Sequence, residues 1–241
     1  EAVSENKTIP TEQLIISKSQ TFSLIPASIG LASLEHKLAS HPDKLKILKR
    51  LINNQLGSFD YVVVDCPPNL GILTLNALVA SNFALIPLMA CDFSLNGMEI
   101  LKNILIMVRE FQGKSPTPFF LLNQIDRRSR YARDFIVRSQ KRLGRLLLKN
   151  VIRTNIHLRA AAAAGKHIFD YMPKSRGAED FTALAKEWES VTLRTTWKSL
   201  FLKGHDLGDV YVVGDFNNWQ KTESYRLQRI GSDIWSTNIA L

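Results

Sequence analysis

Asp65 is the residue whose type and position most clearly indicate chemistry, because it directly follows the apolar run YVVV at residues 61–64. A short β-branched run of this kind predicts a strand buried on both faces. Cys66, Pro67 and Pro68 come next, and proline cannot donate a ladder hydrogen bond, so the strand must end there. In open α/β sheets ligands bind at the carboxyl ends of strands. Asp65 is therefore a candidate ligand-binding carboxylate; the alternative is an aspartate that caps the following turn.

A block of positive charge is the second chemical feature. The chain has a net charge of +9, and residues 127–149 contain nine basic residues and one acid, Asp134, a local balance of +8. Such a block attracts polyanions, nucleic acid first among them. The alternative is an ordinary solvated helix face.

Alternating strands and helices must position these residues. Apolar spacing predicts short strands over residues 14–16, 22–25, 61–64, 83–88 and 119–122, and helices over 45–56, 72–80, 98–108 and 131–149, with a further helix beginning near IPASIGLASLEHKL. This order predicts an α/β fold, a mostly parallel sheet flanked by helices.

Composition limits the class of protein. The 45% apolar content supports a normal core, and no apolar run reaches membrane-spanning length. The first residues do not form a signal peptide. Cys66 and Cys91 lack metal or redox spacing, so we expect two buried thiols in a reducing compartment. The sequence starts at Glu1 rather than Met, which predicts a missing upstream segment.

The aliphatic run, Asp65 and the two prolines resemble the Walker B segment of the ParA/MinD family of P-loop ATPases, which usually reads D-x-P-P. In that family the aspartate holds a water on the magnesium ion of the nucleotide. The resemblance implies that Asp65 is a catalytic residue and a magnesium ligand through water, with Pro67 and Pro68 beside ATP. It also implies that Asn123 hydrogen-bonds the adenine edge, since an amide donates and accepts. An asparagine that only ends a strand is the alternative.

A second resemblance to the same family covers residues 152–187. The family has I-x-R-x-N, then G-K, S-R-G-A and L-A-x-E; the matching residues here are Ile152, Arg153, Asn155, Gly165, Lys166, Ser175, Arg176, Gly177, Ala178, Leu184, Ala185 and Glu187. The family assembles its DNA surface across an ATP-dependent dimer from basic residues in this region. That implies DNA contacts by Arg153, Lys166, Lys174 and Arg176. The sequence departs from the family at residues 160–162, which are alanines where Glu-Ala-Pro is common.

The phosphate-binding loop of the family, G-x-x-x-x-G-K-[ST], does not occur in the 241 residues. Gly113-Lys114-Ser115 does not complete this motif, because Val108 occupies the position of the first glycine. A predicted helix, rather than a strand, also precedes the segment. The resemblance covers about residues 9–190. We interpret the sequence as an amino-terminally truncated ParA-like protein whose intact form uses ATP and Mg; the alternative is a natural pseudo-ATPase.

The last part of the chain has a different pattern. Aromatic and β-branched residues alternate between Gly and Asn turns, which predicts antiparallel strands of a partial β-sandwich. The segment VYVVGDFNNW resembles the glycogen-binding modules of isoamylases and AMP-activated kinase β-subunits, in which the tryptophan stacks on a glucose ring. The resemblance implies α-glucan contacts by Asn217, Asn218 and Trp219; a purely structural module is the alternative.

We therefore predict a ParA-like ATPase domain over residues 1–193 and a partial glycogen-binding-like module over 194–241. The expected function is non-specific DNA binding and chromosome or plasmid partition, or cargo positioning, in the cytoplasm on the nucleoid. Expected partners are an ATP-dependent second copy and a partition or cargo-adaptor protein. A MinD-like membrane-positioning ATPase would need a basic amphipathic helix at the carboxyl end. This chain has a β pattern there, which argues against that class. A non-enzymatic α-glucan-binding adaptor on an inactive P-loop scaffold is the alternative.

Overall fold

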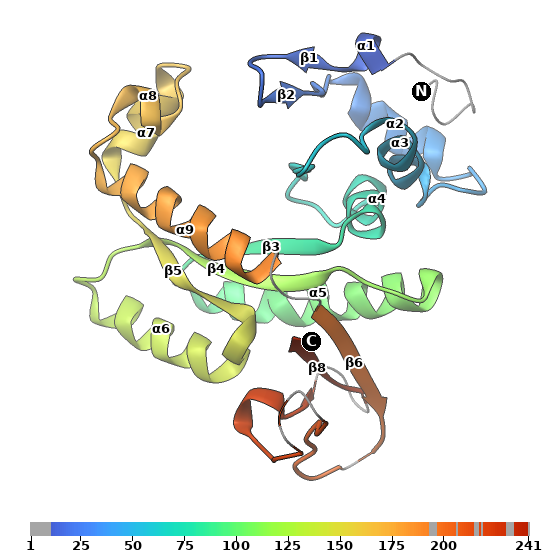
Figure 1. The fold of residues 1–241 in the computed structure, drawn as a ribbon, viewed down its shortest axis with the longest axis vertical. Helices are drawn as coiled ribbons and strands as arrows, with labels where there is room; N and C mark the ends of the chain where they lie inside the picture. The colour runs from blue at the N-terminus through green and yellow to red at the C-terminus, as the bar shows by residue number, and fades with distance from the viewer. Residues whose placement is uncertain are drawn as a thin grey trace. The chain divides into compact units, whose positions relative to one another are not determined.

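The computed structural model describes residues 11–192, 197–205, 207–214, 217, 219–229 and 234–240 (Figure 1). Its contacts divide into two units, Glu1–Asn82 with Leu105–Pro116, and Phe83–Ile104 with Thr117–Leu241. Helix α5 (Asp92–Gln112) contributes residues to both units. No helix in the described part of the chain is long and apolar enough to cross a bilayer.

The first unit is built from short elements and helices. Its elements are α1 (Thr11–Leu14), the hairpin strands β1 (Ile16–Ser17) and β2 (Ser23–Leu24), α2 (Gly30–Leu38), α3 (Ile47–Gln55) and α4 (Ile72–Ala80). The buried amide of Asn76 on α4 joins two helices: its Oδ1 accepts from the backbone N–H groups of Ile47 and Leu48, at 3.1 and 3.3 Å. These are orphan donors of the first turn of α3, so a side chain from another helix caps it. The predicted helices over 45–56 and 72–80 are confirmed.

The predicted buried strand over residues 61–64 is wrong. This segment forms no ladder with any described strand, and the exposed fraction of Val63 is 91%. A strand exists only where a second backbone pairs with it, so an apolar run alone is not enough. Asp65 therefore lies in an irregular exposed segment, and Cys66 is exposed rather than buried.

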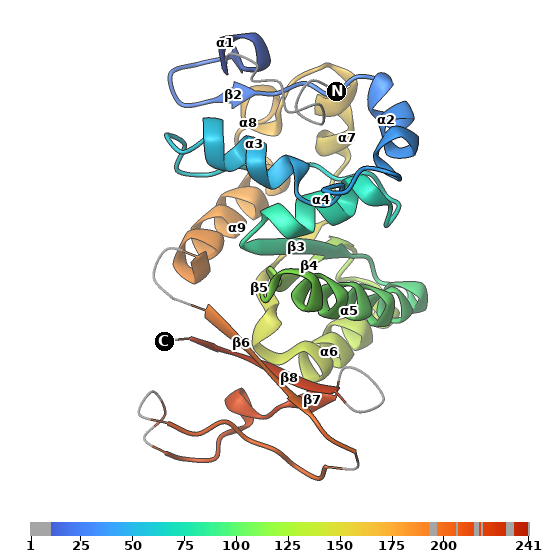
Figure 2. The ribbon, with the colours of Figure 1, turned by 90° about the vertical axis from the view of Figure 1, so that its right-hand side faces the viewer.

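The second unit contains a parallel sheet with the strand order β3-β4-β5. The strands are β3 (Phe83–Leu88), β4 (Thr117–Ile125) and β5 (Leu147–Arg153); the helices beyond α5 are α6 (Arg130–Leu143), α7 (Ile156–Ala163), α8 (Ile168–Tyr171) and α9 (Arg176–Thr192). Figure 2 shows α9 on one side of the sheet and α5 and α6 on the other. The predicted α/β class and parallel sheet are confirmed.

Alternating side chains of β4 fill the two faces of this sheet, as the strand period requires. Phe120 and Leu122 pack with residues of α5 and α6, among them Met98 and Phe135. Phe119 packs in the opposite cluster with Trp188 of α9, edge to face, with ring centroids 5.7 Å apart. These apolar faces, buried on both sides, fix the layer order of the unit.

The predicted helix over 131–149 is too long. Helix α6 ends at Leu143 because Gly144 takes φ +52°, a backbone conformation that commonly terminates helices. A single 3-10 turn, η1 (Gly144–Leu146), follows, and Leu147 and Leu148 then point to opposite faces of the sheet. The apolar run at 146–148 therefore belongs to a turn and a buried strand rather than to a helix.

Two carboxylates of α9 bind the backbone of β5. Glu187 accepts from the backbone N–H groups of Lys149 at 2.7 Å and Asn150 at 2.9 Å, and Asp180 accepts from that of Arg153 at 2.9 Å. Asp180 and Glu187 are seven residues apart, which places them on one face of the helix. They align α9 along the strand and satisfy strand donors that need acceptors.

The carboxyl-terminal elements form a separate antiparallel sheet. Strands β6 (Trp197–Lys203), β8 (Ile234–Ala240) and β7 (Gln228–Arg229) have the order β6-β8-β7, and η3 (Glu223–Tyr225) precedes β7. The predicted antiparallel strands are confirmed. The partial β-sandwich stays a prediction, because the residues described beyond position 196 form one sheet. The predicted domain boundary at 193/194 lies outside the described residues.

Candidate functional site

Asp65 presents an exposed carboxylate that makes no hydrogen bond or ion pair with any described residue. Among the described residues, no group of three or more His, Cys, Asp or Glu side chains could hold a metal ion. Mg²⁺ does not need such a cluster, because it keeps most of its waters and is held by one or two carboxylates plus phosphates. A single open oxygen donor fits this mode of binding.

The thiol of Cys66 lies next to this carboxylate in the chain. Its sulfur is 3.7 Å from the carbonyl oxygen of Val64. Partial desolvation of the sulfur, although the residue is exposed, and secondly the negative charge of Asp65 raise the pKa of the Cys66 thiol above its ordinary value. Both causes disfavour the thiolate, so Cys66 is not an activated nucleophile.

Asn123 lies near the carboxyl end of β4, at an irregularity of the strand that other residues hold in place. Its Oδ1 accepts from the backbone N–H of Gln124 at 3.0 Å, and Gln124 has φ +55°. The Thr154 hydroxyl donates to the Gln124 carbonyl at 2.9 Å, and the Thr154 N–H donates to Ile125 O at 3.2 Å. A left-handed non-glycine residue is uncommon and marks strain that the surroundings maintain. The Asn123 amide nitrogen has no acceptor among the described residues.

The motif residues around α7 have structural roles. Asn155 is the N-cap of this helix, and its Oδ1 accepts from the His157 N–H at 2.8 Å. Gly165, at φ +63°, follows the helix in the conformation that a side chain disfavours. The exposed Lys166 comes directly after this glycine. The G-K pair therefore ends α7 and turns the chain toward α8.

The S-R-G-A motif forms the start of α9. Ser175 Oγ accepts from the Ala178 N–H at 3.2 Å, as an N-cap does. A Cβ on Gly177 would lie 2.9 Å from Leu158 Cγ, closer than real Cβ atoms approach, so α7 and α9 pack tightly at this point. Arg176 is exposed in the first turn of α9, where the helix dipole disfavours positive charge.

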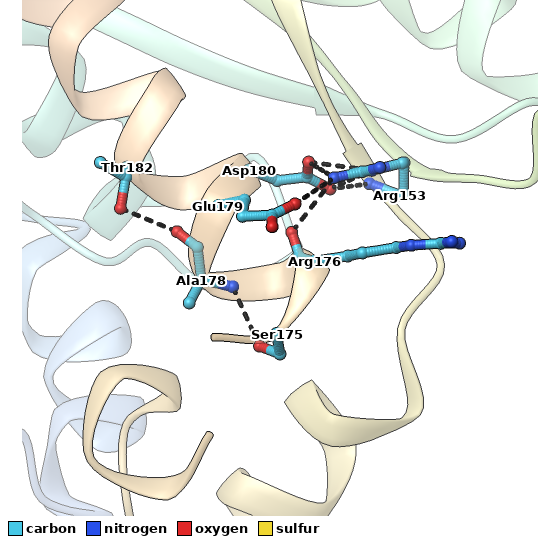
Figure 3. A network of polar contacts seen from close by, with 7 residues as sticks. All are labelled: Arg153, Ser175, Arg176, Ala178, Glu179, Asp180 and Thr182. Atoms are coloured by element: carbon cyan, nitrogen blue, oxygen red, sulfur yellow. Dashed lines mark hydrogen bonds and ion pairs between the residues drawn. The ribbon is translucent and has the colours of Figure 1, made fainter. Parts of the chain in front are cut away.

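Arg153 is held by carboxylates of α9 (Figure 3). Its Nε and Nη2 donate to Asp180 Oδ1 at 2.9 and 2.6 Å, and Nη2 also lies 3.3 Å from Glu179 Oε2. Hydrogen bonds to Asp180, foremost, raise the pKa of Arg153. Nη2 also donates to the carbonyl of Arg176 at 3.5 Å. The guanidinium therefore anchors the start of α9 rather than extending into solvent.

Three of the four predicted DNA-contact residues are open to solvent. Lys166, Lys174 and Arg176 are exposed, and none of their side chains forms an ion pair with the described residues. All three belong to the continuous stretch from the end of α7 to the start of α9. Arg153 is joined to this stretch through its bond to the Arg176 carbonyl.

Asp180 is the site residue that the sequence patterns missed. It is buried, and its two oxygens bind both the backbone and the side chain of Arg153. A signal for it existed, because Asp180 lies at helical spacing between Gly177 and Leu184, both on the buried face of α9. A carboxylate on a buried helix face needs a cationic or N–H partner.

Hydrogen bonds of Asn217 connect the described residues around Trp219. The exposed fraction of Trp219 is 67%, and its φ is +59°. Asn217 accepts from the Gly214 N–H at 2.9 Å and donates to the carbonyls of Val212 and Gln220, at 2.9 and 3.1 Å. Its amide is thus used in bonds to the backbone of Val212, Gly214 and Gln220. Asn218 lies outside the described residues.

Comparison with known proteins identifies the family. The chain is 34% identical over 169 residues to the sporulation initiation inhibitor protein Soj of Bacillus subtilis, a match that covers 70% of this chain and 67% of Soj. The chain belongs to the ParA/Soj family of P-loop ATPases. A family profile described as an AAA domain also matches residues 2–115.

A second relative supports the family, and a solved structure supports the fold. The chain is 30% identical over 167 residues to the chromosome partitioning protein ParA of Myxococcus xanthus, of which it spans 58%. The structure of cobyrinic acid a,c-diamide synthase from Mycobacterium smegmatis, with a bound ATP analog and magnesium, superposes with a TM-score of 0.64 at 25% identity. That match covers 79% of this chain and 72% of the synthase. The P-loop NTPase-like fold is thereby established, and the chain spans only part of its ParA/Soj relatives.

Proposed function

We propose that the protein containing this chain is a partition ATPase of the ParA/Soj type. It binds non-specific DNA as an ATP-dependent homodimer and positions a chromosome, a plasmid or another cargo through a partition or cargo-adaptor protein. It acts in the cytoplasm, on the nucleoid. The observation that supports this proposal most directly is the exposed set Lys166, Lys174 and Arg176, which no described carboxylate neutralises.

In this proposal the DNA contacts go to phosphates. Cationic side chains on a loop and a helix start supply charge and hydrogen-bond donors but no means to distinguish base pairs. Phosphate contacts fix the position of the duplex without selecting a sequence, which a partition ATPase on bulk DNA requires. Arg153 supports the contact indirectly, because its bonds to Asp180 and the Arg176 carbonyl fix the start of α9. We therefore assign Arg153 a positioning role in place of the direct phosphate contact that the family motif implies for it.

ATP and Mg²⁺ are the proposed cofactors. Asp65 supplies the oxygen that orients a water of the metal, and Asn123 supplies the amide that hydrogen-bonds adenine, with Pro67 and Pro68 bordering the nucleotide. When bound, Mg²⁺ neutralises charge that develops on the transferred phosphoryl group. The open carboxylate of Asp65 and the unused donor of Asn123 support these roles.

The test is the nucleotide dependence of DNA binding in the protein that contains this chain. Fluorescence anisotropy of a labelled random duplex is recorded with ATP and with ADP, for the wild type, Asp65→Ala and Cys66→Ala. We expect ATP to tighten binding in the wild type and in Cys66→Ala but not in Asp65→Ala. ATP-independent binding that is equal in all three proteins would contradict the proposal.

A second candidate function rests on Trp219. An exposed indole on a left-handed backbone is uncommon, and a flat aromatic face can stack on the apolar face of a sugar ring. This favours a carboxyl-terminal module that binds an α-glucan, in an adaptor whose ATPase part is inactive. The two candidates are separated by the anisotropy experiment, because an adaptor of this kind shows no response of DNA binding to ATP.

A further inference from the structure

Helix α6 and the residues beside it carry most of the excess charge of the chain. All nine basic residues between positions 127 and 149 are exposed; they are Arg127, Arg128, Arg130, Arg133, Arg138, Lys141, Arg142, Arg145 and Lys149. Seven of the nine are arginines. Arginine presents a planar fork of donors that matches phosphate geometry better than the ammonium group of lysine.

This basic face differs from the surface with Lys166, Lys174 and Arg176. Ala132, Phe135 and Leu143 of α6 pack on the same sheet face as α5. Helix α9, with Arg176, packs on the opposite face of the sheet (Figure 2). The solvent side of α6 is therefore a second cationic surface, on the other outer layer of this unit.

The charge distribution on α6 is unfavourable for an isolated helix. Its first turn contains no acid and begins with Arg130, next to Arg127 and Arg128. The positive end of the helix dipole repels these cations. Arg138 and Arg142 are four residues apart, a spacing at which like charges repel, and Asp134 is the single acid within the helix. Solvated helices usually alternate the signs of their charges, and α6 does not.

Contacts within the chain use only part of this charge. Arg128 pairs with Asp126 at 2.9 Å, and the guanidinium of Arg138 lies 5.7 Å from the centroid of the Tyr131 ring. By contrast, the side chains of Arg127, Arg130, Lys141 and Lys149 form no ion pair within the described residues. These four side chains, which have no acidic partner in the described part of the chain, remain available to an external polyanion.

We propose that α6 is a phosphate-binding surface that holds the backbone of duplex DNA within a single subunit and without nucleotide. The inference rests on the proposed DNA-binding function and adds a second contact surface to it. The 14 residues of α6 extend over about 21 Å at about 1.5 Å per residue. That length matches about six phosphates of one strand, at about 3.4 Å each.

Duplex DNA fits this surface better than an acidic protein does. The centres of protein interfaces are apolar and depleted of charge. On the solvent side of α6 the exposed large apolar residues are Tyr131 and Val137, separated by Arg133 and Asp134. The remaining surface is guanidinium, ammonium and amide, which suits a regular line of phosphates.

The experiment compares two double variants of the full chain, residues 1–241, in the absence of nucleotide. Arg130→Gln/Lys141→Gln removes two unpaired charges from α6. Lys18→Gln/Lys186→Gln removes two exposed lysines elsewhere and is the matched control. Anisotropy of a labelled 30-base-pair random duplex is measured from 50 to 300 mM NaCl. Circular dichroism confirms that both variants fold.

Each phosphate contact contributes about 0.9 to the slope of log K against log salt. We expect Arg130→Gln/Lys141→Gln to flatten this slope by about 1.8 and to weaken binding about 60-fold at 0.1 M salt. The control keeps the wild-type slope. Arg130→Gln alone leaves the thermal midpoint unchanged or raises it, because it removes a cation from the amino terminus of the helix.

Three results would overturn the inference: no DNA binding by the chain at 50 mM salt, equal slopes in both double variants, or competition by poly-glutamate as strong per charge as by duplex DNA. The last result identifies an acidic protein as the partner. Lys166→Gln/Arg176→Gln and the α6 double variant are also compared in the ATP-bound protein that contains this chain, which separates this inference from the proposed function. If only Lys166→Gln/Arg176→Gln weakens DNA binding there, the proposed function stands and the α6 surface fails. If only Arg130→Gln/Lys141→Gln weakens it, the α6 surface stands and the proposed function fails.

Discussion

The ion pair between Arg153 and Asp180 is predicted to stabilise the fold, whatever its role in DNA binding. Two arginine–aspartate pairs in this chain have almost the same geometry. Arg153 Nε and Nη2 approach Asp180 Oδ1 at 2.9 and 2.6 Å, while Arg128 Nε and Nη2 approach Asp126 at 3.0 and 2.9 Å. They differ in exposure: the side chains are 31% and 9% exposed in the first pair, and 91% and 44% in the second.

The expected cost follows from this difference in exposure. Removing one partner of a buried pair costs about 3 to 5 kcal/mol, because the other charge stays buried. Asp180 also accepts the backbone N–H of Arg153, and an unsatisfied donor adds about 1 to 3 kcal/mol. Since Arg153 is partly solvated, we expect Asp180→Ala to lower the free energy of unfolding by about 3 kcal/mol, near the lower end of the range for buried pairs. The coupling free energy between Arg153→Ala and Asp180→Ala should be about 2 kcal/mol.

Double-mutant cycles on both pairs measure this difference. Urea denaturation is followed by circular dichroism for Arg153→Ala, Asp180→Ala and their combination, and for the matched set Arg128→Ala and Asp126→Ala. The exposed pair should show no coupling above experimental error, as solvated ion pairs usually do. Equal coupling in the two cycles, or none in either, would refute the argument that burial makes the first pair strong.

Three further predictions concern other parts of the chain. Gly177→Ala should lower the free energy of unfolding by about 1 kcal/mol, because its Cβ would lie 2.9 Å from Leu158 Cγ. Gly97→Ala, at an open site on α5, should raise the free energy of unfolding by about 0.5 to 1 kcal/mol. A change of the same sign in both variants would contradict this prediction. In a Cys91→Ser background, alkylation of Cys66 by iodoacetamide should reach its half-maximal rate above pH 9.0, because the raised pKa keeps the thiol protonated. Asp65→Asn should lower this midpoint because it removes the carboxylate charge. An unchanged midpoint would show that Asp65 does not act on the thiol. Maltooligosaccharides should quench the fluorescence of a complete carboxyl-terminal module. The quench should be lost in Trp219→Ala and kept in Trp235→Phe. A quench that survives Trp219→Ala would show that Trp219 does not contact the sugar.

Local patterns in the sequence predicted the elements that depend on local chemistry. The bounds of α4 and β3 match the predicted spans, because helical spacing of apolar residues marks the first element and a continuous apolar run marks the second. The helix predicted to continue to residue 149 failed at Gly144, whose left-handed backbone ends α6. The sequence contained that glycine, but helical spacing of the basic residues outweighed it.

Features that depend on distant partners could not be predicted in the same way. The run at residues 61–64 has strand-like residues, but a strand needs a paired backbone, and the described residues provide none. The role of Arg153 depends on Asp180, 27 residues later, so the family motif alone placed it among the DNA contacts. Lys166, Lys174 and Arg176 are exposed because of their local setting at helix ends, and the DNA contacts expected of them stay a prediction.

The salt dependence of DNA binding shows whether Lys166, Lys174 and Arg176 contact phosphates while Arg153 only positions them. It is measured in the ATP-bound protein that contains this chain, for the wild type, Arg153→Ala and Lys166→Gln/Lys174→Gln/Arg176→Gln. We predict that the triple variant flattens the slope of log K against log salt by about 2.7 for each subunit that contacts the duplex, at about 0.9 per phosphate contact. Arg153→Ala should keep the slope while it lowers the stability of the fold. A flattened slope in Arg153→Ala together with a wild-type slope in the triple variant would contradict it.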